Sequence, residues 1–163
     1  MMTTHTIAPC LWFDRQAEEA AQFYTSIFLD SRIDGILCAS VYTPGATTGE
    51  TLLVDFTLAG QKYQALNGGA HDRFNDASSL VVTCQDQAEV DRLWDALSAD
   101  GGQPVQCGWL KDKFGVSWQI VPDVLPQMLN DQDRDKSKRV MEAIIQMVKL
   151  DIGELQKAYN QSA

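Results

Sequence analysis

The sequence predicts an α+β fold built from two copies of a strand–helix–strands unit, followed by a helical tail. The main reason for this prediction is that two segments of the first copy each resemble a segment of the second copy, in the same order. The first copy covers about residues 6–69, the second about residues 78–122, and the tail about residues 123–160. Because 163 residues is an ordinary length for one domain, we expect residues 1–163 to form a single domain.

The first pair of segments predicts a strand and a helix in each copy. Gln-Ala-Glu triplets at 16–18 and 87–89 align residues 11–24 with residues 82–95, which lie 71 positions further on. In each segment an apolar strand leads through a polar turn into a helix. The helices are indicated by apolar residues at helical spacing, which are Ala17, Ala20, Phe23, Tyr24 and Ile27 in the first copy and Val90, Leu93, Trp94 and Leu97 in the second.

Helix-boundary signals flank the second of these helices. Asp86 followed by Glu89 has the form of a capping box, which satisfies the first free backbone N–H groups of a helix. Gly101 and Gly102 are typical of a helix end.

The second pair of segments predicts one further strand in each copy. Residues 60–66 and 115–121 each begin with a turn glycine and place an aromatic residue and then a glutamine at the same offset. Because successive strand residues point to opposite faces, Tyr63 and Gln64 lie on different faces, as do Trp118 and Gln119.

The remaining residues of the first copy supply two more strands, at 33–42 and 51–58. The first copy therefore has the order βαβββ. It runs 47 residues from Phe13 to Gly60, whereas the matching stretch of the second copy, Cys84 to Gly115, runs only 31. The difference is about one strand plus a loop. We therefore expect the second strand of the second module to be lost or shortened.

The tail has a helical pattern throughout. A short helix is expected at 122–129, and a longer one at 135–149 has an apolar face. Asp151 is expected to cap a last helix that reaches Tyr159. Such a tail either packs on its own core or covers a partner subunit.

Composition and charge exclude several classes of partner. The formal charge of −9 disfavours nucleic acid, and the basic residues at 134–139 alternate with acidic ones, as on a solvated helix start. No apolar run reaches about 18 residues, so no membrane span is expected. With no secretory signal at the N-terminus, the four cysteines are expected to be reduced in a cytoplasmic protein.

Three stretches of the chain resemble PhnB-like proteins, a subgroup of the vicinal-oxygen-chelate (glyoxalase and bleomycin-resistance) superfamily. The resemblance covers roughly residues 7–122. The stretches are Pro9-Cys10-Leu11-Trp12-Phe13-Asp14 with the helix start after it, Ala65-Leu66-Asn67-Gly68-Gly69 with Phe74-Asn75, and the long run from Cys107 to Gln119. The resemblance implies paired βαβββ modules whose sheets curve around a cleft, and a dimer in many members.

In the enzymes of this superfamily, four strand positions in the cleft hold a divalent metal through His, Glu or Gln. Carried over to this chain, the positions fall at Ala8 (or Pro9), Gln64, Ser79 and Gln119. None of these side chains carries a negative charge or an imidazole, and a divalent ion needs such donors to repay its lost hydration. We therefore predict no metal at this site and no other cofactor.

Alternation along the predicted strands indicates which side chains line the cleft. Ala8, Cys10 and Trp12 face it from the first strand, and Ser79, Val81 and Thr83 from the first strand of the second copy. Such a lining suits a small, partly apolar organic ligand. The candidate ligand-binding residues are Cys10, Trp12, Gln64, Asn67, His71, Ser79 and Gln119.

Each candidate also has a purely structural interpretation. Trp12 can fill core space, Gln64 and Gln119 can bond each other, and Asn67 can shape a turn. The two histidines, His5 and His71, are more simply explained as exposed or hydrogen-bonded than as metal ligands, although His71 beside Asp72 is the better candidate for contact with a ligand.

These observations lead to three functional hypotheses. The favoured one is a metal-free small-molecule-binding protein, and the second is a vicinal-oxygen-chelate enzyme (isomerase, lyase or dioxygenase-like) with an atypical active site. The third is a non-catalytic assembly module. Some PhnB-like proteins bear a methyltransferase label, but no strand here enters a glycine-rich turn that opens a long helix, as a nucleotide-like cofactor would need. We leave open whether the protein is an enzyme, and we expect a homodimer.

Overall fold

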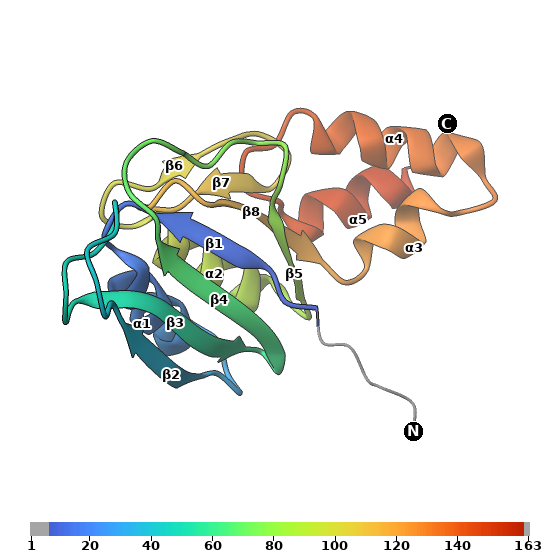
Figure 1. Cartoon of the computed structure of the whole chain (residues 1–163). Coiled ribbons are helices and arrows are strands. Elements are labelled where there is room, and N and C mark those ends of the chain that lie inside the picture. The colour runs from blue at the N-terminus through green and yellow to red at the C-terminus, as the bar shows by residue number, and fades with distance from the viewer. Residues whose placement is uncertain (1–6, 162–163) are drawn as a thin grey trace, which may run out of the picture. The chain divides into compact units, whose positions relative to one another are not determined.

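The computed structural model describes residues 7–161, so His5 lies outside the described residues. The chain divides into two compact units, with the boundary between Arg73 and Phe74. The first unit contains the first predicted module, and the second unit contains the second module together with the tail (Figure 1).

The first unit has the predicted βαβββ order. Its elements are β1 (Cys10–Phe13), α1 (Ala17–Ile27), β2 (Arg32–Cys38), β3 (Thr51–Leu58) and β4 (Gln61–Asn67). The strand order in the sheet is β1-β4-β3-β2, with β1 parallel to β4 and the other pairs antiparallel. Helix α1 packs against β3 and β4 and lies behind the sheet in Figure 1, so the viewer faces the side of the sheet that α1 leaves uncovered.

An aromatic stack fixes which strand residues face the helix. Phe56 of β3 is fully buried, with its ring centroid 6.4 Å from that of Tyr24 in α1 and 5.4 Å from that of Tyr63 in β4. Tyr63 therefore lies on the helix side of the sheet, as alternation predicts, and Gln64 lies on the opposite face. We call that opposite face the open face of unit 1.

The second unit repeats this architecture with shorter strands. Its elements are β5 (Leu80–Cys84), α2 (Gln87–Ser98), β6 (Gln103–Pro104), β7 (Trp109–Lys111) and β8 (Ser117–Pro122). Their order, β5-β8-β7-β6, is that of the first sheet. The predicted shortening is confirmed, since β6 has two residues, and β7 has only three. Pro104 helps to end β6 because proline has no N–H to donate to a strand ladder.

The two module helices begin in different ways. Asp86 caps α2 as predicted, because its Oδ1 accepts from the Glu89 backbone N–H at 2.8 Å. The Glu89 carboxylate accepts in return from the backbone N–H of Gln85, one residue before the cap. Gln16, at the start of α1, makes no such side-chain bond. Asn67, from the end of β4, supplies the acceptor instead, 2.8 Å from the Ala17 N–H.

The tail forms three helices, α3 (Leu125–Leu129), α4 (Arg134–Ile144) and α5 (Ile152–Asn160). Asp151 caps α5 through the Glu154 N–H, as predicted. Helix α4 ends five residues before the predicted end at 149, because the backbone carbonyls of Met147 and Val148 accept from Cys107 and Gly108 at 2.8 Å instead of continuing a helix.

The tail has a hydrophobic core that also involves residues before it. Its buried members are Leu125, Met128, Val140, Ile144, Leu150 and Leu155, against which Cys107 and Val121 of the second module pack. The basic residues of α4 serve this packing: Arg139 donates to the carbonyls of Ala158 and Tyr159, and the Lys136 ammonium lies 5.0 Å from the Tyr159 ring centroid. Across residues 7–161, no helix is long and apolar enough to cross a membrane.

Candidate ligand-binding site

The open face of unit 1 carries three rows of side chains, set by the strand register. In the central row, β1 pairs Cys10 with Gln64, β3 pairs Asp55 with Gln64, and β2 pairs Gly35 with Asp55. Paired residues point to the same face, so these four lie side by side. The Gln64 Nε2 donates to the Asp55 Oδ1 at 2.9 Å, which holds the half-buried amide against the exposed carboxylate.

A pocket of about 500 Å³ opens over part of this face. It is lined by Ala8, Asp34, Asp55, Lys62, Tyr63 and Gln64. Ala8 and Gln64, the two positions of this unit to which the resemblance assigns metal ligands, both line this pocket.

One side of the central row is a network of paired charges. Asp34 accepts from the Lys62 ammonium at 2.8 Å and from the Thr57 hydroxyl at 2.6 Å, and its second oxygen lies 2.9 Å from the Arg32 Nε. The hydrogen bond from Lys62, followed by that from Thr57, lowers the pKa of Asp34 below its usual range. The Lys62 and Arg32 cations are therefore already committed to one carboxylate.

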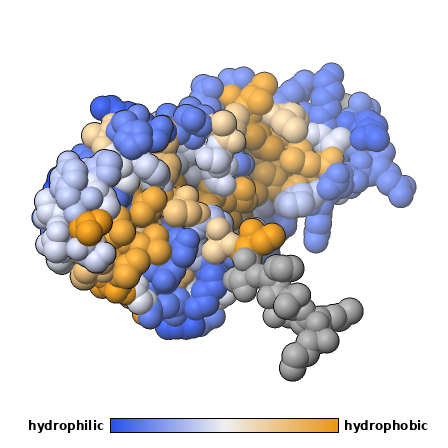
Figure 2. Space-filling view, viewed as in Figure 1, coloured by the Kyte–Doolittle hydropathy of each residue, from blue (hydrophilic) through white to orange (hydrophobic). Residues whose placement is uncertain are grey.

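The other side of the central row is apolar. Trp12, Leu66, Leu53 and Leu37 are paired in register across the four strands, each two residues from its neighbour in the central row. Leu37 is 56% exposed, and the other three are half-buried. In Figure 2, hydrophobic side chains gather over one end of β3 and β4, and hydrophilic ones over the end where these two strands are joined.

Trp12 of β1 and His71 of the loop after β4 lie together at the apolar side of the central row. The two ring centroids lie 4.9 Å apart in an edge-to-face arrangement, and the Trp12 Nε1 donates to the Gly69 carbonyl at 2.9 Å. His71 is exposed and lies 3.2 Å from the Asp72 carboxylate. A Cβ on Gly68 would lie 2.2 Å from the Trp12 ring, so the indole packs directly on the loop backbone.

Asn67 has a structural role within the same unit. Its side chain is buried, with Oδ1 capping α1 at Ala17 and Nδ2 donating to the Thr51 carbonyl at 2.8 Å. Both polar ends of the side chain are thus used by the fold. Ligand contact by Asn67 stays a prediction, and we leave this residue out of the contact set proposed below.

The second unit places Ser79 and Gln119 together on its own open face. The Gln119 Nε2 donates to the Ser79 hydroxyl at 2.8 Å. In the strand register Gln119 pairs with Trp109 on β7 and with Val81 on β5. Trp109 therefore occupies the place that Asp55 has in unit 1, so the second face has an indole where the first has a carboxylate.

These residues do not fit a divalent metal ion. The four positions to which the resemblance assigns metal ligands supply one methyl group, one hydroxyl and two neutral amides, a set without the anionic or imidazole donors that a divalent ion needs. Burial, and to a smaller extent the Asp55 charge, raises the pKa of the Cys10 thiol, whereas a metal needs the thiolate. Within residues 7–161, His, Cys, Asp and Glu side chains form no cluster of three or more that would hold an ion.

Sequence reasoning missed Asp55 as a site residue. The signal was present, since an aspartate in the middle of the apolar strand Thr51–Leu58 must lie on an exposed face or be paired. Its importance appears only when the register of β2, β3 and β4 is known.

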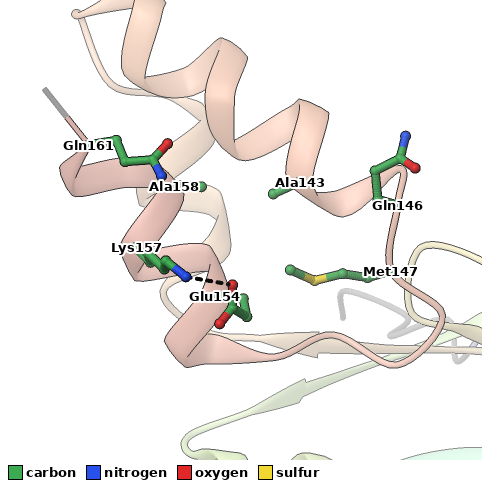
Figure 3. A pocket seen from close by; sticks show the side chains of 7 residues that line it. All are labelled: Ala143, Gln146, Met147, Glu154, Lys157, Ala158 and Gln161. Carbon is green, nitrogen blue, oxygen red and sulfur yellow. Dashed lines mark ion pairs between the residues drawn. The ribbon is translucent and has the colours of Figure 1, made fainter. Parts of the chain in front are cut away.

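A second pocket, of about 390 Å³, lies between α4 and α5 (Figure 3). Ala143 and Ala158 leave room between the helices, Met147 reaches in from the turn after α4, and Glu154 pairs with Lys157 at 3.7 Å. Because its one ion pair is internal and exposed, this pocket offers no unpaired charge to a ligand. We therefore regard the open face of unit 1 as the main candidate.

Comparison with known proteins places this arrangement in a family. A sequence profile described as 3-demethylubiquinone-9 3-methyltransferase matches residues 5–121. The chain belongs to this family. The match ends where the second module ends, so helices α3 to α5 lie outside it. No curated protein matches the chain.

Solved structures agree with this family and with the fold. The PhnB protein of Bacillus cereus, named as a 3-demethylubiquinone-9 3-methyltransferase, is 35% identical, with a TM-score of 0.65 over 72% of this chain and 99% of that one. FosX, a fosfomycin resistance protein of Listeria monocytogenes, is 14% identical, with a TM-score of 0.53 over 77% of this chain and 98% of that one. The PhnB-like, vicinal-oxygen-chelate assignment and the α+β fold predicted from sequence are confirmed.

Proposed function

We propose that this protein binds a small, partly apolar organic molecule on the open face of unit 1 and does so without a resident metal. The observation that carries the proposal is the pairing of Gln64 with Asp55 at the place where related enzymes hold a metal. The pocket supplies hydrogen-bonding groups, and the apolar row lies on the same face, at the other side of the central row. This combination is typical of sites that orient small organic ligands.

Methyl transfer is less well supported than binding, despite the family description. A methyl donor of nucleotide type needs glycines that leave space for its backbone contacts. In this chain the space beside Gly68 is filled by the Trp12 ring, and a Cβ on Gly69 would meet Pro44 at 3.2 Å. These glycines support close packing of the chain on itself and do not form a cradle for a cofactor.

Nucleophilic catalysis by Cys10 is also poorly supported. The thiolate is the reactive form of cysteine, and both burial and the nearby Asp55 charge raise the pKa of this thiol. Cys10 is therefore a neutral contact at physiological pH. We propose the contact set Cys10, Trp12, Gln64 and His71 in unit 1, with Ser79 and Gln119 as the matching positions of unit 2.

A thermal-shift screen with small aromatic and thiol-containing compounds tests the proposal. A compound that binds the folded chain at a concentration well above its Kd raises the unfolding temperature. We expect at least one such compound to stabilise the unaltered protein and to lose most of this effect in Gln64→Leu. The matched control is Gln22→Leu, at an exposed position of helix α1. Absence of stabilisation by every compound would favour an assembly module instead.

The expected homodimer and cytoplasmic location remain proposals. Exposed apolar side chains on α4 and just after it, Met141, Ile145 and Val148, provide a surface for a second copy. Light scattering at micromolar concentration should give twice the mass of the chain, and a monomer would contradict the proposal. The four free cysteines, two of them exposed, suit a reducing compartment.

A further inference from the structure

Asp55 is the one residue of the central row that bears a formal charge at neutral pH. Its neighbours in register are Gly35, Gln64 and, one strand further, Cys10. Glycine and glutamine are neutral, and the raised pKa of Cys10 keeps the thiol protonated. The middle of the open face therefore carries a single negative charge.

The fold leaves this charge without a cation. Within the described part of the chain, Asp55 is in no ion pair, and its one side-chain partner is the neutral amide of Gln64. The nearest basic groups on this face, Lys62 and Arg32, both bind Asp34 instead, at 2.8 and 2.9 Å. Asp34 is therefore paired with two cations, whereas Asp55, which lines the same pocket, is paired with none.

Gly35, the residue of β2 that pairs with Asp55, lies beside open space. A Cβ built on Gly35 would meet nothing within 4 Å, and the backbone φ of this residue is not in the left-handed region that favours glycine. The strand pairing is irregular between Ile33 and Gly35. The β2 position paired with Asp55 therefore carries no side chain that could cover this part of the face.

An apolar surface begins one step away from the carboxylate. Leu53 lies two residues from Asp55 on the same strand face, and it continues the row of Leu37, Leu66 and Trp12. Residues two apart on a strand are separated by about 7 Å. If the apolar part of a molecule covers this row, a polar group joined to it by a short spacer therefore lies next to the Asp55 carboxylate.

We propose that the ligand of this face is an organic cation, whose ammonium or amidinium group pairs with Asp55 and whose apolar body covers the row of Leu37, Leu53, Leu66 and Trp12. This inference rests on the small-molecule binding proposed above and adds the charge class of the ligand. The net charge of −9 favours the approach of a cation over that of an anion.

Three probes of one shape test the charge requirement. These are 2-phenylethylammonium, the neutral 2-phenylethanol and the anionic 3-phenylpropanoate, whose dissociation constants are measured by calorimetry with the full chain. We expect the amine to bind about five- to tenfold more tightly than the alcohol, as for a partly exposed charged hydrogen bond, and the anion to bind most weakly. Equal binding of amine and alcohol would overturn the inference while leaving small-molecule binding intact.

Two variants separate a local contact from the general field of an acidic protein. Asp55→Asn should reduce the preference for the amine to within about twofold, because it removes the charge and keeps the shape. Asp14→Asn, at an exposed position of the same unit, removes one charge elsewhere and should keep the preference. Equal losses in both variants would overturn the inference. Should Asp55→Asn fail to fold, the comparison of the three probes on the unaltered protein still decides.

Absence of binding by all three probes would also overturn the inference. The thermal-shift screen then tests the proposed function independently of the charge of the ligand. A neutral or anionic compound that stabilises the protein through Gln64 would preserve the proposed function, and a screen without any stabilising compound would remove both.

Discussion

At the scale of single residues, the contact between Trp12 and Gly68 explains the shape of the apolar side of the site. The indole lies where a Gly68 side chain would be, and its Nε1 holds the next residue, Gly69, through the carbonyl. His71 then packs edge-to-face on the same indole. Trp12 is thus both a structural support of the loop and a candidate ligand contact.

Gly68→Ala should destabilise the protein by about 1–3 kcal/mol, because the added methyl group would overlap the Trp12 ring and force a shift of the indole or the loop. Urea denaturation measures the loss. Gly35→Ala is the matched control, since its methyl group enters open space and should change the stability by less than about 0.5 kcal/mol. Equal effects of the two substitutions would contradict the contact described here.

The thiols should react in an order set by burial and local charge. Cys84 is buried, and burial first of all raises its pKa to about 11, so a disulfide reagent should label it only on unfolding. Cys38 and Cys10 both lie at the surface, but partial burial of the Cys10 thiol, followed by the Asp55 charge, raises its pKa and should make it the slower of the two at pH 8. Mass spectrometry of labelled peptides assigns the sites. Asp55→Asn should accelerate Cys10, and an unchanged rate would argue against the proximity of the two groups.

Some of these site residues could be recognised from the sequence, and others could not. Gln64 and Gln119 could be placed because they sit at one offset from a turn glycine in two repeated strands. Asp55 could not be recognised, because its neighbours on the face come from β2 and β4, and cross-strand register is not local information. The structural use of Asn67 was hidden for the same reason, since its partners lie 50 and 16 residues away.

At the scale of the elements, the two module helices show how one pattern is capped in two ways. Helix α2 has a local cap in Asp86, which the spacing between Asp86 and Glu89 predicts. Helix α1 depends on Asn67 from the end of β4, so its start is tied to the completion of the sheet. The start of α1 therefore requires a long-range contact, and that of α2 does not.

Asn67→Ala should cost about 2 kcal/mol, since it removes the cap at Ala17 and also the donor to the Thr51 carbonyl. Asp86→Ala should cost about 1 kcal/mol, because it removes a single capping bond. Chemical denaturation of the two variants under one set of conditions measures both losses. A larger effect of Asp86→Ala would contradict the double role of Asn67.

Strand lengths were partly predictable at this scale. The 16-residue deficit of the second module indicated a shortened strand, and β6 has only two residues. The end of α4 was predicted too late. Ile145, Met147 and Val148 continue the apolar pattern, but the carbonyls of Met147 and Val148 accept from Cys107 and Gly108 instead.

At the scale of the whole chain, the tail is an integral part of the second unit. Leu150 is buried in the tail core and touches Gly108, where a Cβ would lie 3.0 Å from its side chain. The Leu150 carbonyl accepts from Gln87 at the start of α2, and the Lys149 ammonium pairs with Asp91 in the same helix. The second unit therefore depends on residues that the family profile does not cover.

Leu150→Ala should destabilise the second unit by about 2–5 kcal/mol, as expected when a buried leucine is truncated in a packed core. Gln156→Ala, at an exposed position of α5 outside the proposed dimer surface, is the control and should cost less than about 0.5 kcal/mol. Because tryptophans occur in both units, thermal unfolding is best followed by circular dichroism. Similar stabilities of the two variants would mean that the tail is not part of the core.

The central claim is that the open face of unit 1 binds its ligand without a metal, and one measurement on a single sample tests it most directly. Protein purified without chelator is analysed for Zn, Fe, Mn and Ni, and the binding of 2-phenylethylammonium is measured before and after exhaustive chelation. We expect far less than one metal ion per chain and the same dissociation constant in both states. A near-stoichiometric metal whose removal abolishes binding would contradict the account.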